Sequence, residues 1–146
     1  MASDDCATAE HLLAEYLAVV ARYSGEMHRL HALPTETSEL TEIYLAAVRA
    51  LVGAGRARKE YSVHVQAHRC RRDDLRLKDA EEHLKQPKIP ALLTIRTGIS
   101  LADVERLLIS ATILHTMGNL AETASILGIN RSTLYDKLKR YGIAAR

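Results

Sequence analysis

The sequence of 146 residues contains neither phenylalanine nor tryptophan, and it has only three prolines and seven glycines. A core built without those two aromatics must rest on leucine, isoleucine, valine, alanine and the six tyrosines. That inventory, with so few helix breakers, favours helices over a sheet. The apolar fraction of 47% and the charged fraction of 26% are ordinary for a globular protein, so the composition predicts a mainly α-helical fold.

Long apolar runs are also lacking, and none approaches the roughly 18 to 20 residues that span a bilayer. The acidic start, residues 1–11, has no basic stretch of the kind that opens a secretory signal. We therefore expect a cytoplasmic protein without membrane attachment. Its two cysteines, Cys6 and Cys70, lie far apart in the sequence, and in the cytoplasm such a pair is expected to be reduced rather than bridged.

The overall charge is nearly balanced, with 20 basic against 18 acidic residues, but it is distributed unevenly along the chain. Residues 1–50 hold three basic and eight acidic side chains, a net charge of −5, whereas residues 51–97 hold eleven and six, a net charge of +5. Residues 130–146 carry five basic side chains and one acidic one. A weakly charged chain can therefore present a local cationic surface near its C-terminus.

The first half of the chain is predicted to form a helical hairpin. From about residue 8 to 31, apolar residues recur at steps of three and four, which is typical of an amphipathic helix. After Pro34, Ser38 can cap a second helix, which we expect to end at the glycines of residues 53–55. We treat residues 1–90 as an N-terminal helical segment for dimerisation or regulation, and as a candidate surface for a protein partner.

The segment that follows the hairpin admits two interpretations. Apolar and polar residues alternate from 61 to 68, which is typical of a short half-exposed strand that residues 92–95 could pair with. Alternatively, the second helix continues through this segment. Residues 74–85 then predict a charged, solvent-facing helix, and Pro87 and Pro90 mark a boundary after it.

The last fifty residues contain the signals of three further helices. Ser100, with Asp103 three residues on, forms a capping box at the start of a helix predicted over residues 101–117. The apolar residues of this helix exceed a single stripe, so we expect it to pack both within its own chain and against a second subunit.

Two short helices joined by a tight glycine turn come next. Asn119 can cap a helix over residues 120–127, Gly128 and Ile129 form the turn, and Asn130 can cap a basic final helix that ends near Tyr141. These are the parts of a helix-turn-helix.

The stretch from Asn119 to Gly142, NLAETASILGINRSTLYDKLKRYG, resembles the helix-turn-helix of the bacterial Fis family. The lead-in from Ile95 to Glu105, IRTGISLADVE, is similar to the approach to that domain in NtrC-type enhancer-binding activators. The resemblance covers about residues 95–143, a third of the chain. It implies that residues 95–146 form a DNA-binding domain.

The resemblance further implies a homodimer whose final helices enter the major groove of double-stranded DNA. Asn119 would donate to a phosphate, Asn130 and Arg131 would face base edges or nearby phosphates, and Arg131 is the best candidate to read a guanine. The expected DNA-binding residues are Asn119, Asn130, Arg131, Ser132, Thr133, Tyr135, Lys137, Lys139 and Arg140. The expected dimerisation residues are Leu101, Val104, Leu108 and Ala111.

Two positions depart from the Fis pattern, since Glu122 and Asp136 stand where Fis has basic residues. Each change weakens the attraction to phosphate and argues against strong nonspecific binding. Tyr135 is common at its position among the activators and favours a site-specific regulator. No glycine is followed by lysine and then serine or threonine, so the sequence has no phosphate-binding loop and predicts a regulator without its own ATPase.

No other group of residues in the sequence indicates a catalytic or cofactor site. His64, His68 and Cys70 lack a second ligand pair at zinc-like spacing, so we expect solvated surface rather than a metal site. No histidine has the context of a serine or cysteine triad, so an enzyme is the least supported class. Arg69, with the two arginines that follow Cys70, is either a second DNA contact or a solvated run.

Three functions remain open at this point. The first is a sequence-specific transcriptional regulator that binds an inverted repeat as a dimer. The second is an architectural protein that bends DNA with little sequence preference. The third is a regulatory module whose acidic N-terminal hairpin binds a protein or a small signal.

Overall fold

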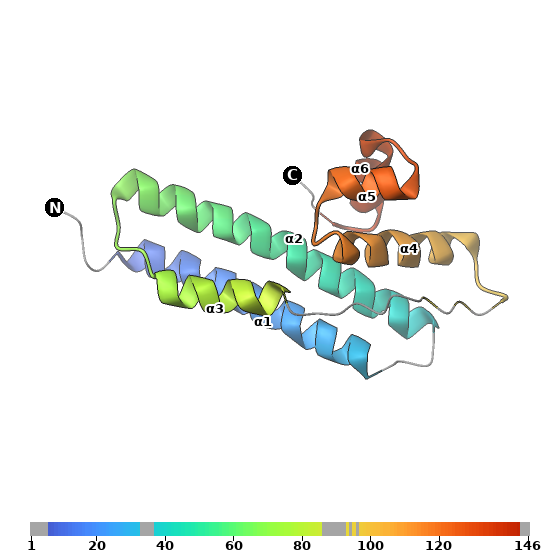
Figure 1. Cartoon of the computed structure of the whole chain (residues 1–146), viewed down its shortest axis with the longest axis horizontal. Coiled ribbons are helices and arrows are strands. Elements are labelled where there is room, and N and C mark those ends of the chain that lie inside the picture. Colours follow the sequence, from blue (N-terminus) through green and yellow to red (C-terminus); the bar gives the residue numbers. More distant parts are fainter. Residues whose placement is uncertain (1–5, 33–36, 86–92, 94, 96, 144–146) are drawn as a thin grey trace.

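The computed structural model describes residues 6–32, 37–85, 93, 95 and 97–143, which form six helices and no strand (Figure 1). The mainly α-helical fold predicted from composition is therefore confirmed. The helices are α1 (Ala7–His31), α2 (Thr37–His68), α3 (Asp74–Lys85), α4 (Leu101–His115), α5 (Leu120–Leu127) and α6 (Arg131–Arg140). None of these helices is both long and apolar enough to cross a bilayer.

The two longest helices form a hairpin on which the other four are arranged. α1 packs along α2, and α3 lies against α1 at the end of the hairpin where the chain leaves α2 (Figure 1). α4 packs on the opposite half of α2 and carries α5, against which α6 packs. The hairpin predicted from sequence is confirmed, and the boundary expected near Pro87 and Pro90 falls outside the described residues.

The second helix of the hairpin is longer than its glycines suggest. The prediction that it ends at residues 53–55 is wrong, because α2 continues to His68, so the strand interpretation of residues 61–68 is wrong too. Each glycine costs about 1 kcal/mol in a helix interior. Fully burying one large side chain is worth about 1.5–3 kcal/mol, and Ala54 between the glycines and Tyr61 beyond them are both buried. Packing against α1 and α3 therefore outweighs the local cost.

Replacing Gly55 by alanine is expected to raise the free energy of unfolding by up to about 1 kcal/mol. An added Cβ at Gly55 meets nothing within 4 Å, so only the gain in helix propensity remains. Urea unfolding measures the change. Gly53→Ala is the matched control, since its Cβ would lie 3.3 Å from Cγ1 of Val19 and should gain less or lose stability. Equal gains at both positions would contradict this account of the packing.

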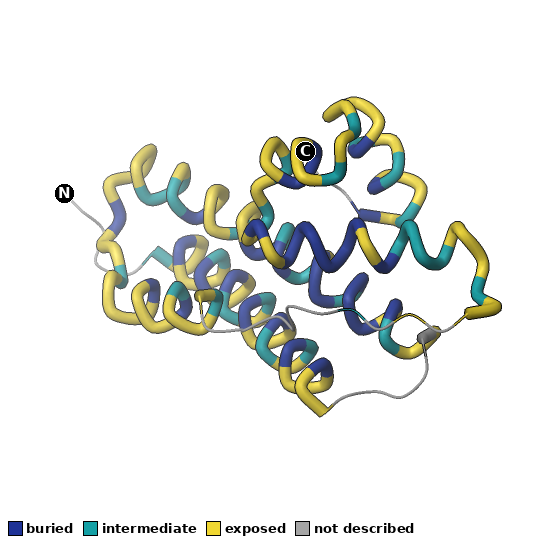
Figure 2. Tube along the Cα trace, turned by 45° about the vertical axis from the view of Figure 1, so that its right-hand side comes forward, coloured by how far each residue is buried: buried dark blue, intermediate teal, exposed yellow. Residues whose placement is uncertain are grey.

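The buried side chains form two clusters along the hairpin, visible as the dark inner faces of the helices in Figure 2. The first joins the hairpin to the last three helices, and its most buried members include Tyr23, Leu30, Tyr44, Val48, Leu107, Ile113, Leu114, Leu134 and Leu138. The second lies at the other end and consists of Ala9, Leu13, Tyr16, Val20, Ala54, Tyr61, Cys70, Leu77 and Ala80. Residues before and after the boundary expected near residue 90 thus share one core around α4.

Candidate DNA-binding site

The turn between α5 and α6 has the geometry that its sequence predicts. Gly128 adopts a left-handed conformation with φ of +67°, and the N–H of Ile129 donates to the carbonyl of Ala124 at 3.1 Å. Glycine adopts this conformation without the steric cost that a Cβ imposes. The turn therefore ends α5 and allows α6 to begin at Arg131.

Asn119 caps α5 through a reciprocal pair of hydrogen bonds with Glu122. The N–H of Glu122 donates to Asn119 Oδ1 at 3.2 Å, and Asn119 Nδ2 donates to Glu122 Oε2 at 3.2 Å. A buried bond of 2.7 Å between the hydroxyls of Thr116 and Thr123 holds the start of α5 to the end of α4. The acidic residue that departs from the Fis pattern thus has a structural role as the partner of the cap.

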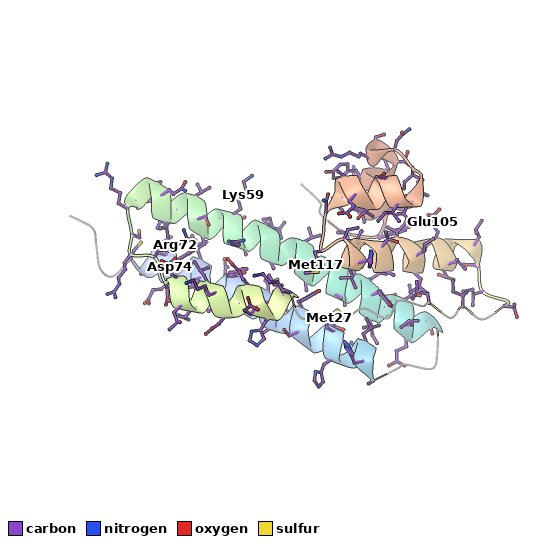
Figure 3. The ribbon with its side chains drawn as sticks, in the orientation of Figure 1. Met27, Lys59, Arg72, Asp74, Glu105 and Met117 are labelled. Atoms are coloured by element: carbon purple, nitrogen blue, oxygen red, sulfur yellow. The ribbon has the colours of Figure 1, made fainter. Side chains whose placement is uncertain are left out.

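Glu105, labelled on α4 in Figure 3, holds α6 in place through contacts that were not predicted from sequence. Its carboxylate accepts one hydrogen bond from Lys137 Nζ and one from the Tyr141 hydroxyl, both at 2.7 Å. The Arg106 guanidinium lies over the ring of Tyr141, 5.4 Å from its centroid. A guanidinium of Arg49 on α2 also donates to the Tyr141 carbonyl at 2.9 Å. The orientation of α6 is thereby fixed relative to both α4 and the hairpin.

The same contacts shift the ionisation of the groups involved. Hydrogen bonds from Lys137 and Tyr141 lower the pKa of Glu105, so its charged form is favoured in the folded protein. Burial and then the hydrogen bond to Glu105 raise the pKa of Tyr141 to about 12. The pair is therefore an anionic carboxylate and a neutral phenol near neutral pH.

Replacing Glu105 by glutamine is expected to lower the free energy of unfolding by about 1 kcal/mol near pH 7, a modest value because the carboxylate is 40% exposed. A lowered carboxyl pKa stabilises the fold above the ordinary value of 4.5, and that contribution disappears as the pH falls below it. The difference between wild type and variant should therefore shrink on acidification. Urea unfolding from pH 7 to 3 measures it, with the exposed Glu82→Gln as control. A pH-independent difference would contradict the assignment.

The outer face of α6 is exposed and carries most of the expected DNA-binding residues. Leu134 and Leu138 are fully buried against the rest of the domain, which turns the remaining faces of the helix outward. The expected residues found exposed are Asn119, Asn130, Arg131, Ser132, Thr133, Lys139 and Arg140. Tyr135 and Lys137 are half-buried, and the Lys137 ammonium is paired with Glu105. Five of these exposed residues thus lie on α6 itself, Asn130 directly precedes it, and Asn119 lies at the start of α5.

Asn130 occupies the N-cap position of α6, but its side chain forms no capping hydrogen bond. The prediction that it caps this helix is therefore wrong in that respect. The first amide groups of a helix carry partial positive charge and need acceptors. A phosphate oxygen is a suitable acceptor there, next to the exposed guanidinium of Arg131.

The four expected dimerisation residues fall into different environments on α4. Leu101 is 83% exposed and Leu108 is 45% exposed, and their spacing of seven residues places them on one face. Val104 is half-buried. Ala111 is buried within its own chain, so it adds nothing to the exposed apolar surface.

The short helix α5, the glycine turn and the basic helix α6, packed on α4, form a helix-turn-helix. Comparison with known proteins gives its type, because residues 100–141 match the family described as bacterial regulatory protein, Fis family. These residues are a Fis-type helix-turn-helix DNA-binding domain. Residues 1–99 lie outside that match.

Individual relatives match over a similarly short stretch. DNA-binding protein Fis of Buchnera aphidicola is 54% identical over 43 residues, which are 30% of this chain and 43% of that protein. Fis of Aliivibrio fischeri is 49% identical over 43 residues, 30% of this chain and 44% of that protein. A signal-transduction and transcriptional-control protein of Clostridium beijerinckii is 49% identical over 47 residues, 32% of this chain and 7% of that protein. The chain thus covers less than half of each, and no solved structure matches it.

Proposed function

We propose that this chain is a transcriptional regulator that binds specific sites on double-stranded DNA as a homodimer. The observation that carries the proposal is the exposed cationic face of α6, held on the domain by the contact of Lys137 and Tyr141 with Glu105. Arg131 is the first residue of α6, and the N-terminal residues of a recognition helix contact base edges, which supports Arg131 as a base reader. Lys139 and Arg140, near its end, would bind the phosphate backbone.

The proposed dimer forms through the exposed apolar face of α4. Leu101 and Leu108 are large apolar side chains left in solvent by their own chain, and a two-fold interface would cover both at once. Two α6 helices related by such an axis would reach successive major grooves about one helical turn apart. A homodimer would therefore recognise an inverted repeat.

The structure favours a site-specific regulator over an architectural protein of low specificity. Asp136 is exposed on the basic helix and Glu122 lies on α5, so both acidic groups reduce the attraction to the DNA backbone. A protein with weaker nonspecific binding to the DNA backbone depends more on base contacts, such as that proposed for Arg131. These 146 residues contain no phosphate-binding loop, so we propose a non-enzymatic regulator without its own ATPase, working at the bacterial nucleoid in the cytoplasm.

One observation supports a second function for this chain, that of a regulatory module that binds a protein partner. A groove of about 800 Å³ lies along α1 and α2, and charged side chains of both signs line it, including Glu15, Arg22, Glu26, Arg29, Arg56 and Glu60. A protein partner with charged side chains of both signs would suit this groove. Such a partner would bind the hairpin while α6 binds DNA.

Selection of bound duplexes from a randomised pool by the full chain, at near-physiological salt, tests the proposal. A two-fold symmetric motif is the expected result, and its half-site spacing reports the dimer geometry directly. Diffuse enrichment of A·T-rich sequence would favour an architectural role instead. The absence of any enrichment would overturn the proposal and favour the interaction module.

A further inference from the structure

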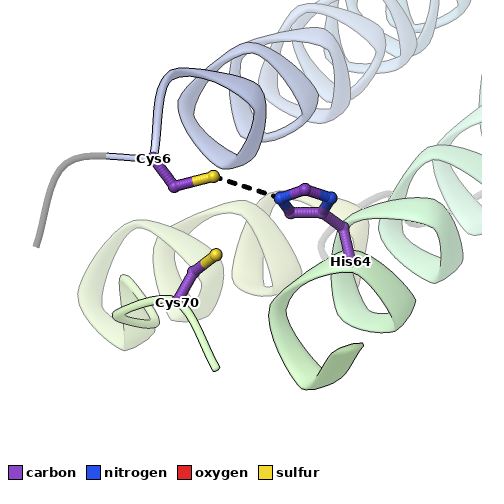
Figure 4. A group of neighbouring side chains, drawn as sticks. All are labelled: Cys6, His64 and Cys70. Atoms are coloured by element: carbon purple, nitrogen blue, oxygen red, sulfur yellow. Dashed lines mark hydrogen bonds between the residues drawn. The ribbon is translucent and has the colours of Figure 1, made fainter. Parts of the chain in front are cut away.

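Three side chains that could ligate a metal meet at the end of the hairpin farthest from the helix-turn-helix (Figures 1 and 4). Cys6 precedes α1, His64 lies in the last turns of α2, and Cys70 follows α2 in the loop to α3. Their ligand atoms all lie within 4.8 Å of one another, and Cys6 Sγ and His64 Nε2 share a hydrogen bond of 3.1 Å. Residues separated by 58 and 64 positions in the sequence thus converge on one point.

The surroundings of these residues differ from the solvated surface expected from sequence. Cys70 is buried, with 8% of its surface exposed, and Cys6 and His64 are half-buried. His68 is exposed, and it stacks on His64 with ring centroids 4.5 Å apart, which restrains the orientation of the ligand ring. The cluster is therefore formed by the fold and is not a chance meeting of mobile surface groups.

The backbone at the end of α2 positions Cys70. Arg69 adopts a left-handed conformation with φ of +51°, and the N–H of Cys70 donates to the carbonyl of Val65 at 3.2 Å. The N–H of Asp73 then donates to the buried Tyr61 hydroxyl at 3.2 Å, which holds the loop against α2. A non-glycine residue in this conformation persists only where its surroundings maintain it. The surrounding contacts thus hold the loop that contains Cys70 in this conformation.

We propose that Cys6, His64 and Cys70 bind one divalent cation of the zinc class, with a fourth position open to water. Two thiolates and one imidazole are ligands that tetrahedral Zn²⁺ prefers, at about 2.3 Å for sulfur and 2.0–2.1 Å for nitrogen. Tetrahedral ligand atoms at those bond lengths lie about 3.5–3.8 Å apart. The observed separations of up to 4.8 Å need only small side-chain movements to reach that geometry.

Access from solvent is compatible with such a site. A pocket of about 480 Å³ opens beside Cys6 and Cys70, giving a metal ion a route from solvent. Binding would release the thiol protons and join the start of α1, the end of α2 and the loop to α3.

The test uses the full, reduced, metal-free chain titrated with Co²⁺ and then with Zn²⁺. We expect one metal per chain, a thiolate-to-cobalt charge-transfer band in the near ultraviolet, the visible bands of tetrahedral cobalt, and displacement of Co²⁺ by Zn²⁺. Cys6→Ser and His64→Gln should each weaken binding by more than about tenfold. His28→Gln is the matched control, because it removes an exposed histidine of α1 elsewhere on the chain and should leave binding unchanged.

Two results would overturn the metal site. One is metal binding that persists unchanged in Cys6→Ser, since the ligands would then lie elsewhere. The other is a reduced chain that binds no metal; rapid closure of a Cys6–Cys70 bond under mild oxidation would then identify the pair as a disulfide. The charge-transfer band is measured on the wild-type chain, so this second result does not depend on the folding of any variant.

Discussion

Replacing Arg131 by alanine is expected to weaken binding to the selected DNA site by about 1–3 kcal/mol and to flatten the base preference at one position of each half-site. Arg131 is exposed at the first position of α6, where a recognition helix approaches base edges. A guanidinium can donate two hydrogen bonds to the acceptors of a guanine, and alanine can donate none. Binding assays on the selected site, on single-base variants of it and on random DNA measure both effects.

Lys139→Ala is the matched control on the same helix. Lys139 is also exposed and cationic, but it lies near the end of α6, where phosphate contacts are expected. Its loss should weaken binding to all sequences alike and reduce the dependence of affinity on salt by about one charge. Equal losses for both variants on specific and random DNA would show that Arg131 is a phosphate contact rather than a base reader.

The features of the helix-turn-helix that could be predicted from sequence are those that a few neighbouring residues determine. Ser100 and Asn119 cap their helices as expected, with the N–H of Asp103 or Glu122 donating to the cap at 3.2 Å. The left-handed turn at Gly128 is likewise a local requirement. Within such segments, the hydrogen-bond partner lies three or four residues away, so the pattern of residue types is sufficient.

The features that could not be predicted depend on contacts between distant segments. The two glycines of α2 are local signals for the end of a helix, yet the helix continues past them because it packs against α1. Glu105 meets partners 32 and 36 residues away, and no spacing rule connects them in advance. The same holds for Cys6 and Cys70. They are far apart in the sequence, and only the packing of α1 against α2 brings them close together.

Replacing Leu108 by aspartate is expected to dissociate the proposed homodimer, with a loss of more than about 3 kcal/mol in association free energy. Leu108 is 45% exposed on the face of α4 that it shares with Leu101. In a two-fold interface the substitution places two unpaired carboxylates in an apolar contact. The folded monomer should be little affected, because Leu108 already reaches solvent. Sedimentation equilibrium at micromolar concentration measures the mass against 16.2 kDa for one chain.

Val63→Asp provides the control for this prediction, because Val63 is 57% exposed on α2, outside the helix-turn-helix. It introduces the same charge at an exposed apolar position and should leave the mass of the dimer unchanged. Since each half-site of an inverted repeat would then be bound separately, Leu108→Asp should also lose most of its affinity for the symmetric site while retaining weak binding to one half-site. A wild-type chain that sediments as a monomer would contradict the proposed homodimer. A Leu108→Asp variant that remains dimeric would contradict pairing through α4 and would favour the hairpin as the interface.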